Sequence, residues 1–429
     1  MVIKKISLPI LFSFWSFAVF AQMIGPEIYI YDDLRSFQLY PDGNPQSLAV
    51  APLGEASSLW LQFDDATANS QALNYTWVHC NRNWTPSPLL SAEYLEGFIE
   101  GQLHQGVLSF NTYMPYSHFS DRLPQASCMP RISGNYYLII YESDPNDYLV
   151  KYPVVFYESL IGIQTSIHRT ANVELAKTHQ EIDALVDLSN FSVQNPFEDV
   201  QLSLVQNRNW QSLRNVAPRY LRNGYYDFDY NNGENAFPGT NIFRFVDSKN
   251  IPVPTLRIPK YDLQDLWRAY VVQDKPRGID PFVNQDDARG AYVPRKQGAN
   301  AESEADYIWM DIWVNDIEQN GQRALYIVGD FNQYRPSDEY RLTFDEKEGA
   351  YRGSILVKQG YLEYHLAEWD EASMRWDLQF TEANHWNCPN DYTAFLYFRQ
   401  WGQRYDRVLG HSSLHTNGIL GLNIQIATP

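Results

Sequence analysis

Cysteine, basic residues and long apolar runs are all scarce in this chain of 429 residues. Its only cysteines are Cys80, Cys128 and Cys388, and they lack the CxxC or Cys/His spacing of zinc ligands. At most one disulfide can form within the chain, and Cys80–Cys128 is the expected pair because both fall in the first third. The chain is therefore not a disulfide scaffold, and its cores must come from ordinary apolar burial.

Positive charge is low as well. The chain has 33 Lys and Arg against 51 Asp and Glu, which gives a formal net charge of −18. Contacts with phosphate require clustered basic residues. We therefore expect neither nucleic acid nor anionic lipid as a partner.

The N-terminus carries one apolar stretch. Lys4 and Lys5 precede an apolar run over residues 6–20, and Val19 and Ala21 are small residues at the positions that a signal peptidase reads. The run is short for a transmembrane helix, and no cysteine stands at the cleavage site for a direct lipid anchor. The sequence predicts a signal peptide over residues 1–21 and an exported, periplasmic chain that begins at Gln22.

Catalytic motifs are missing too. The sequence has no G-x-S-x-G, no H-E-x-x-H, no P-loop and no G-x-G-x-x-G after a strand. His168 and His179 lie in a polar, strand-rich stretch without a serine or cysteine motif nearby, which favours a surface or edge role over that of a catalytic base. We expect no catalytic residue, no cofactor, no metal and no small-molecule substrate.

Paired carboxylates do occur, at Asp64-Asp65, Asp227/Asp229, Asp286-Asp287 and Asp345-Glu346. A glycosidase needs two such groups facing each other across a cleft, which sequence does not establish. Asp345-Glu346 fits a hairpin turn. Asp227, Asp229, Asn231 and Gly233 partly resemble a calcium loop, but the glycine comes one position late and no bidentate glutamate follows. We expect the outward face of an edge hairpin there.

Aromatic residues are abundant, with 12 Trp, 30 Tyr and 22 Phe, and they fall in short alternating runs bounded by turn residues. Residues 136–141 and 152–157 read as strands, and residues 200–205 read as a half-buried strand. Helical patterns are short and confined to residues 89–98 and 261–270. The sequence predicts an all-β chain of tandem immunoglobulin-like β-sandwiches.

Breaks in the strand pattern suggest the domain limits. We expect an N-terminal sandwich over 22–158, a second over 159–273, a linker or long irregular loop over 274–306, and a C-terminal sandwich over 307–429. The order of strands in the last unit resembles the immunoglobulin-like, carbohydrate-binding-type modules that precede the catalytic domains of starch-branching and debranching enzymes. Its expected strands are 325–328, the hairpin 341–344 with 351–357, the strand 361–368, and the pair 395–398 with 404–409.

Two groups of aromatic residues could serve binding. The first unit holds Trp77, His79, Trp84 and Tyr94, and the last holds Trp369, Trp376, Trp386 and Trp401. Exposed aromatic rings anchor protein interfaces and stack on sugars. A role in the sandwich cores is the favoured interpretation.

Several short motifs together resemble one family. They are Trp77-Val78-His79-Cys80-Asn81, Trp84-Thr85-Pro86-Ser87, Glu93-Tyr94-Leu95-Glu96-Gly97-Phe98, Ser133-Gly134-Asn135-Tyr136-Tyr137-Leu138, Asn241-Ile242-Phe243-Arg244-Phe245 and Arg404-Tyr405-Asp406-Arg407-Val408-Leu409-Gly410. In number and order they are similar to the plug proteins of the type IX secretion system. The resemblance spans nearly all of the mature chain, with a departure at residues 387–391.

This resemblance implies a non-enzymatic protein that binds the periplasmic opening of a very large outer-membrane β-barrel translocon and seals the resting channel. It brings no catalytic residues. A periplasmic or surface carbohydrate-binding protein is the alternative, favoured by an exposed coplanar row of Trp369, Trp386 and Trp401. A glycoside hydrolase is a more distant third. Contacts with the barrel are expected at loop tips at one end of a sandwich.

Overall fold

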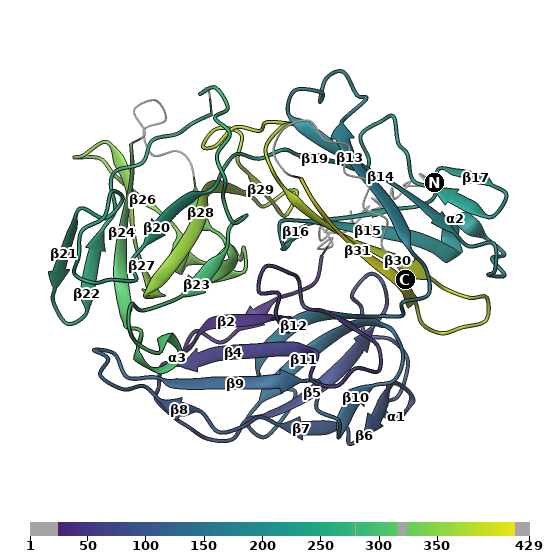
Figure 1. Cartoon of the computed structure of the whole chain (residues 1–429), viewed down its shortest axis with the longest axis horizontal. Helices are drawn as coiled ribbons and strands as arrows, with labels where there is room; N and C mark the ends of the chain where they lie inside the picture. Colours follow the sequence, from purple (N-terminus) through teal and green to yellow (C-terminus); the bar gives the residue numbers. More distant parts are fainter. Residues whose placement is uncertain (1–24, 279, 316–323, 417–429) are drawn as a thin grey trace, which may run out of the picture.

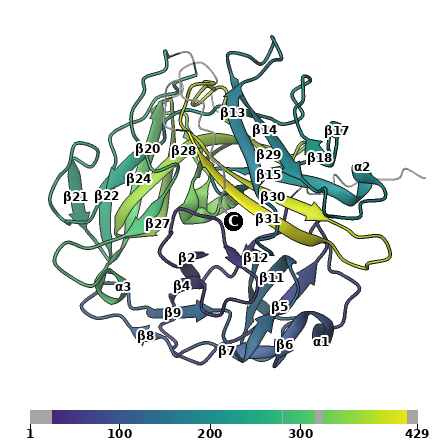
Figure 2. The same ribbon diagram turned by 45° about the vertical axis from the view of Figure 1, so that its right-hand side comes forward.

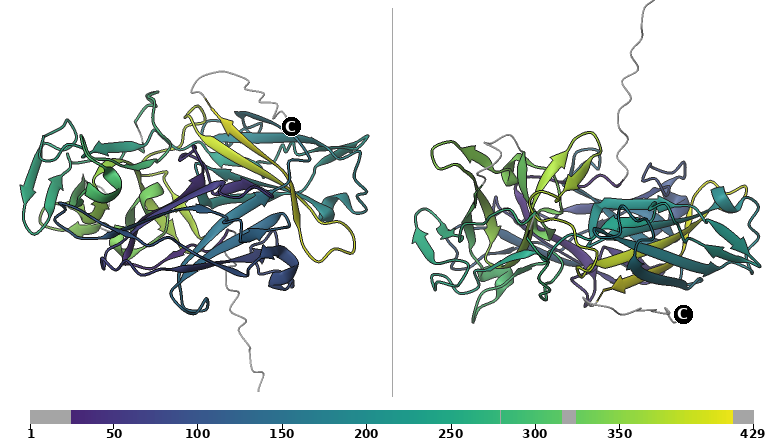
Figure 3. Two further views of the ribbon diagram at one scale, coloured as in Figure 1. Left: turned by 60° about the horizontal axis from the view of Figure 1, so that its bottom comes forward. Right: turned by 90° about the horizontal axis from the view of Figure 1, so that it is seen from above.

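The computed structural model describes residues 25–278, 280–315 and 324–416. Across these ranges the helices are single turns, and the strands build three two-sheet sandwiches placed as a triangle (Figure 1). Views turned about the horizontal axis show a flattened body (Figure 3). None of the helices in the described ranges is long and apolar enough to cross a membrane. The all-β, tandem-sandwich prediction is confirmed, and the expected signal peptide over 1–21 lies outside the described residues.

The first sandwich lies at the bottom of Figure 1. One sheet has the order β1-β12-β11-β5-β7, with β3 beside β12, and the other has the order β2-β4-β9-β8; β10 and β6 form a ribbon near helix α1. The elements are β1 (Tyr29–Ile30), β2 (Leu34–Pro41), β3 (Val50–Pro52), β4 (Leu59–Asp65), β5 (Asn74–Cys80), α1 (Ser91–Tyr94), β6 (Leu95–Gly97), β7 (Glu100–Gln102), β8 (Val107–Leu108), β9 (Ser117–Leu123), β10 (Cys128–Pro130), β11 (Gly134–Tyr141) and β12 (Tyr148–Tyr157).

The second sandwich combines strands from the middle and from the end of the described chain. Its sheets have the orders β13-β14-β18-β17, with β19 beside β14, and β16-β15-β30-β31. The elements are β13 (Ile163–Arg169), β14 (His179–Asp187), α2 (Pro196–Asp199), β15 (Val200–Gln206), β16 (Asn209–Val216), β17 (Tyr220–Arg222), β18 (Tyr225–Asp227), β19 (Ala236–Pro238), β30 (Asp391–Phe398) and β31 (Arg407–His415).

The third sandwich lies at the left of Figure 1. One sheet has the order β20-β28-β23, with β25 and β29 also paired to β28, and the other has the order β21-β22-β24-β27-β26. The elements are β20 (Arg244–Asp247), β21 (Lys260–Leu263), β22 (Trp267–Tyr270), β23 (Tyr292–Pro294), α3 (Ala301–Glu304), β24 (Tyr307–Asn315), β25 (Leu325–Val328), η1 (Asp330–Asn332), η2 (Asp338–Tyr340), β26 (Thr343–Asp345), β27 (Ala350–Lys358), β28 (Gly360–Asp370) and β29 (Arg375–Asp377).

The first two sandwiches stack into four layers. In β30, Tyr392, Ala394 and Leu396 face the core of the second sandwich, whereas Phe395 and Tyr397 face a separate core shared with the first sandwich. Because the side chains of a strand alternate between its faces, a strand with a core on each side is apolar throughout. The neighbouring strand β15 is buried on both faces for this reason, which corrects the prediction that residues 200–205 are half-buried.

Strand pairing also corrects the predicted limits of the second and third units. β30 and β31 pair with β15 of the second sandwich, although residues 307–429 were expected to form one C-terminal module. Conversely, β20 and β22 lie within residues 159–273, which were expected to form the second unit. They belong to the third sandwich, because β20 pairs with β28 and β22 pairs with β24. The chain thus enters the third sandwich early and returns to the second, because the sheets are completed by strands distant in sequence.

The expected linker over 274–306 is part of the third sandwich. It contains β23, which pairs with β28, and the short helix α3. The approach is close, since a Cβ atom added at Gly360 would lie 2.2 Å from the carbonyl oxygen of Val293. The expected helix over 261–270 is likewise wrong: β21 and β22 form an antiparallel hairpin there.

The three cysteines are free and buried, so the expected Cys80–Cys128 bridge is not formed. Cys80 lies in the core that the first sandwich shares with the second. Cys128 lies in the core between the two sheets of the first sandwich. The sheet that contains β5 lies between the two thiols. Cys80, at the end of β5, points to the face of this sheet that is turned away from the core of the first sandwich, whereas Cys128 points into that core.

Candidate functional site

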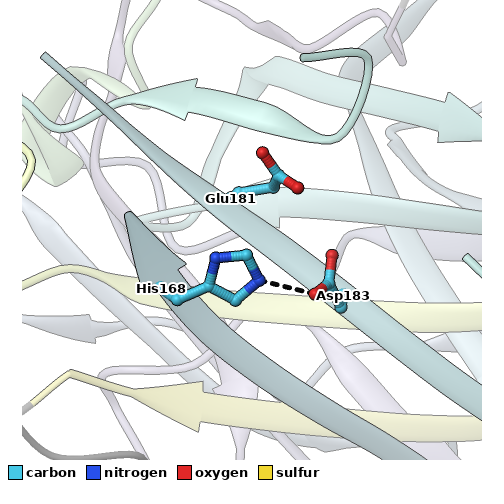
Figure 4. A group of neighbouring side chains, drawn as sticks. All are labelled: His168, Glu181 and Asp183. Carbon is cyan, nitrogen blue, oxygen red and sulfur yellow. Dashed lines mark hydrogen bonds and ion pairs between the residues drawn. The ribbon is translucent and has the colours of Figure 1, made fainter. Parts of the chain in front are cut away.

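The only described group of at least three His, Cys, Asp or Glu side chains close enough to share a metal ion is His168, Glu181 and Asp183 (Figure 4). Their ligand atoms lie within 4.8 Å of one another. His168 stands on the edge strand β13, opposite Glu181 of β14, and Asp183 comes two residues later on the same strand. The predicted edge position is therefore confirmed for His168, whereas His179 begins β14, an inner strand that pairs with β13, β18 and β19.

The hydrogen bonds of this group do not favour a metal. His168 Nε2 lies 2.5 Å from Asp183 Oδ2, and its Nδ1 lies 3.0 Å from the carbonyl oxygen of Arg169. The hydrogen bond with Asp183 raises the pKa of His168 to about 9, so the ring is a cation at neutral pH. The Glu181 carboxylate accepts hydrogen bonds from Thr170 and Ala171. A metal ligand must be a neutral imidazole with a free nitrogen, so the group is best described as an ion pair joining β13 to β14.

The four carboxylate pairs serve as local acceptors. Asp64 accepts hydrogen bonds from the side chains of His118, Tyr307 and Lys358. Asp65 accepts one from the backbone N–H of Thr67. Asp287 accepts from the backbone N–H of Phe243, and Asp345 accepts from that of Lys347 in the predicted hairpin turn. None of these bonds forms the pair of facing carboxylates that a glycosidase requires.

The segment that resembles a calcium loop is an edge hairpin, as predicted. β17 and β18 form the edge of their sheet, and Asp227 at the end of β18 accepts a hydrogen bond from the N–H of Asp229. Asp229 and Asn231 are exposed. The outward-facing interpretation is therefore confirmed.

The aromatic residues of the first unit are core residues. Trp77, His79, Trp84 and Tyr94 are each 6% exposed or less. Of the other group, Trp369 and Trp376 contact each other edge-on at an interplanar angle of 61°, and Trp376 donates to the carbonyl oxygen of Tyr334. These rings belong to packing contacts.

The tryptophan row that would favour sugar binding is not formed. Trp369 belongs to β28 of the third sandwich, whereas Trp386 lies near the second sandwich, with the guanidinium of Arg169 5.7 Å from its ring. Trp401, which is 75% exposed, stands in the connection between β30 and β31. The rings therefore sit on separate elements, and the feature required by the carbohydrate-binding alternative is missing among the described residues.

The first and third sandwiches meet in a polar seam, formed by Ser36, Asp64, Tyr292, Tyr307 and Lys358. Lys358 Nζ and Tyr307 Oη each donate to Asp64 Oδ2 at 2.7 Å. Ser36 Oγ lies 3.0 Å from Tyr292 Oη and 2.8 Å from Tyr307 Oη. Lys358 and Asp64 have side chains only 2% and 1% exposed. A buried ion pair of this kind fixes the relative orientation of the parts it joins.

The first and second sandwiches meet in an apolar seam, formed by Trp84, Tyr137, Trp210, Phe395 and Val408. The Trp84 and Trp210 rings contact each other edge-on with centroids 5.1 Å apart. At the junction of all three sandwiches, Arg208 donates to the carbonyl oxygens of Gln46 and Arg289 and to Asp330. The triangle is therefore held by buried contacts on two of its sides and at its centre.

One edge of the first sandwich exposes large apolar side chains. We call it the apolar edge and define it by six residues that are between 58% and 73% exposed: Leu90, Phe98, Ile99, Val107, Leu108 and Phe110. They lie on or beside β6, β7 and β8, on the side of the first sandwich that faces away from the second (Figures 1 and 2). At Phe110 this side adjoins the third sandwich, because the N–H of Phe110 donates to the carbonyl oxygen of Ser303 in α3. Exposed apolar residues gathered on one edge of a soluble domain mark an interaction surface.

Comparison with known proteins assigns this domain. Residues 34–158 match the family described as "Type 9 secretion system plug protein 1st domain". The first sandwich belongs to the type 9 secretion system plug family. The matched range covers the strands from β2 to β12 and contains the whole apolar edge. This agrees with the resemblance seen in the sequence motifs.

A solved structure supports the fold of the whole chain. A hypothetical protein from Parabacteroides merdae ATCC 43184 is similar with a TM-score of 0.85 at 20% sequence identity, covering 92% of this chain and 100% of that one. At this identity the match shows a shared arrangement of the sandwiches. No curated protein matches the chain at a significant level.

Proposed function

We propose that this protein is a non-enzymatic plug that binds the periplasmic opening of the type IX secretion translocon in the outer membrane and seals the resting channel. The observation that carries the proposal is the plug-family first domain over residues 34–158. The buried seams support it physically, because a stopper for a wide pore must be broad and must not deform.

The apolar edge is the surface that we propose for contact with the translocon. It belongs to the matched domain, and its six side chains are exposed, so a partner can reach them without disturbing the buried residues of either seam. Apolar side chains at the centre of an interface supply most of the binding free energy. A contact that holds such a barrel closed should bury about 1,600 Å² or more.

The test is affinity purification of the tagged, chromosomally expressed protein from detergent-solubilised outer membranes. We expect one very large β-barrel to be recovered in near-equal amount, and Phe98→Lys with Leu108→Lys to reduce its recovery at least tenfold. The matched control is Val173→Lys with Leu256→Lys, two residues of the other sandwiches that are 89% and 93% exposed. This control should leave recovery unchanged.

Sealing is tested separately by uptake of a large hydrophilic antibiotic. Cells that lack the protein, or carry the double lysine variant of the apolar edge, should become more sensitive. Absence of any barrel in the purification would contradict the proposal as a whole. Normal recovery with the apolar-edge variant would contradict only the placement of the contact.

A further inference from the structure

A cleft between the second and third sandwiches has an unusual charge composition. It has a volume of about 100 Å³ and lies where β16 approaches β29, near the centre of Figure 1. Two arginines, Arg214 of β16 and Arg375 of β29, contribute to its wall. No Asp or Glu is found among the described residues that line it. In a protein with a net charge of −18, two arginines in a cleft without a carboxylate require an explanation.

Neither arginine is neutralised elsewhere. Across the described ranges, no salt bridge joins either guanidinium to a carboxylate. Arg214 Nη1 reaches only the carbonyl oxygen of Glu234, at 3.3 Å, and its guanidinium lies over the Phe237 ring at 4.8 Å. Arg214 Nε is buried without a hydrogen-bond partner. A buried N–H of a charged group without an acceptor is costly, and such groups are normally paired.

The remaining wall offers no competing charge. His365 is 2% exposed, and burial lowers its pKa to about 4, so the ring is neutral at physiological pH. Burial, and after it the like charge of Arg375, lowers the pKa of Arg214 to about 10. An anion between them would remove both the repulsion and the unsatisfied N–H.

Most other polar groups of the cleft are already bonded within the protein. Gln206 Nε2 donates to Pro238 and Tyr392, and Asn207 Nδ2 donates to Asn390. Trp376 is fixed by its bond to the carbonyl oxygen of Tyr334 and supplies an aromatic wall together with Phe237. The available donors therefore include the two guanidinium groups and the buried hydroxyl of Tyr334, which has no hydrogen-bond partner among the described residues, beside a surface suited to apolar atoms.

We propose that Arg214 and Arg375 form a binding site for an oxyanionic group, of which a carboxylate attached to a short apolar stem fits the cleft best. Guanidinium groups bind carboxylates through paired N–H donors, and the small volume admits one such group with a few carbon atoms. The carboxylate comes from a free small organic acid or from an acidic side chain of a bound peptide.

The experiment is calorimetric titration of the purified full-length mature protein with glutarate and, in a separate arm, with an acetylated and amidated glutamate. Binding of glutarate alone identifies a free acid as the source, and binding of the capped glutamate identifies a side chain. We expect Arg375→Gln to weaken binding at least tenfold and Arg214→Gln with Arg375→Gln to abolish it. The control Arg222→Gln removes an exposed arginine of β17 and should leave binding unchanged.

Thermal unfolding in a buffer without organic acids gives a second readout. There, Arg375→Gln should raise Tm or leave it unchanged, because it removes one of two like charges that line the same cleft. Glutarate should raise Tm of the wild type more than that of Arg375→Gln. This readout remains informative if the variant with both substitutions does not fold. The proposal is overturned if neither probe binds the wild type, if Arg375→Gln binds as tightly as the wild type, or if Arg375→Gln lowers Tm in the acid-free buffer.

Discussion

The two seams of the first sandwich join it to its neighbours by opposite means. In the polar seam, Asp64 is surrounded by Lys358, Tyr307 and His118, each within 2.7 Å of one of its oxygens. In the apolar seam, Phe395 is fully buried, and its ring is stacked with that of Trp210. The polar seam constrains orientation because its bonds are directional, and the apolar seam stabilises through area removed from water. Together the two seams fix the position of the first sandwich relative to the other two.

The largest expected effect comes from breaking the buried ion pair. Lys358→Met leaves the Asp64 carboxylate, which is 1% exposed, without its cation. We expect the free energy of unfolding to fall by about 3–5 kcal/mol, as is typical when one partner of a buried pair is removed. Urea unfolding measures the change. Asp64→Asn combined with Lys358→Met should restore much of the loss, and equal losses in both variants would contradict the ion-pair account.

A substitution in the apolar seam should lower the free energy of unfolding slightly less than Lys358→Met does. No second substitution is expected to restore the loss. Phe395→Ala removes a ring that is 0% exposed, and we expect a loss of about 3–4 kcal/mol from transfer and cavity terms. Phe395→Leu is the matched control and should cost less than about 1.5 kcal/mol. Both losses should be independent of salt concentration, and a strong salt dependence would show that the seam is not held by burial.

Acid should weaken the region where the first sandwich meets the connection between β30 and β31. His79 is 1% exposed and contacts the ring of Tyr405, and burial lowers its pKa to about 4 from an ordinary value of 6.5. A base with a lowered folded-state pKa contributes stability that is present above pH 6.5 and is lost as pH falls toward 4. His79→Phe should reduce the stability lost between pH 6.5 and pH 4 by about 3 kcal/mol. An unchanged pH profile in urea unfolding would contradict this.

The smallest effect is expected at the exposed rim of the polar seam. Arg35 and Glu339 form an ion pair there at 2.7 Å, with side chains 20% and 32% exposed. Arg35→Gln should cost only about 0.2–1 kcal/mol, and this cost should disappear at high salt. The comparison with Lys358→Met tests whether burial, rather than charge pairing itself, makes the polar seam strong.

The sequence located individual strands well because their patterns are local. The strand expected over 136–141 is β11, the hairpin expected from 341–344 and 351–357 is formed by β26 and β27, and the strand expected over 361–368 is β28. The Asp227/Asp229 hairpin and the edge position of His168 were also predicted. Each of these depends on alternation and turn residues within a few positions.

The assignment of strands to sandwiches could not be predicted in the same way. The hairpin formed by β30 and β31 pairs through β30 with β15, which lies about 190 residues earlier in the chain. The residues of the hairpin do not indicate which strand it will pair with. β15 has the sequence VQLSLVQ, whose alternation of apolar and polar residues indicates a half-buried strand, and only the tertiary structure buries both of its faces. The placement of Arg214 and Arg375 in one cleft is equally non-local, because the two arginines are 161 positions apart in the sequence.

By itself, the sequence determined the all-β class, the positions of most strands and the family of the first domain, because periodicity, turn chemistry and short motifs are carried by neighbouring residues. Tertiary structure decided the exchange of strands between the second and third sandwiches, the separation of Cys80 from Cys128, and the two seams. These depend on which apolar faces cover one another and on where a buried charge finds its partner. Such choices are made by the free energy of the whole packed molecule and not by any one segment.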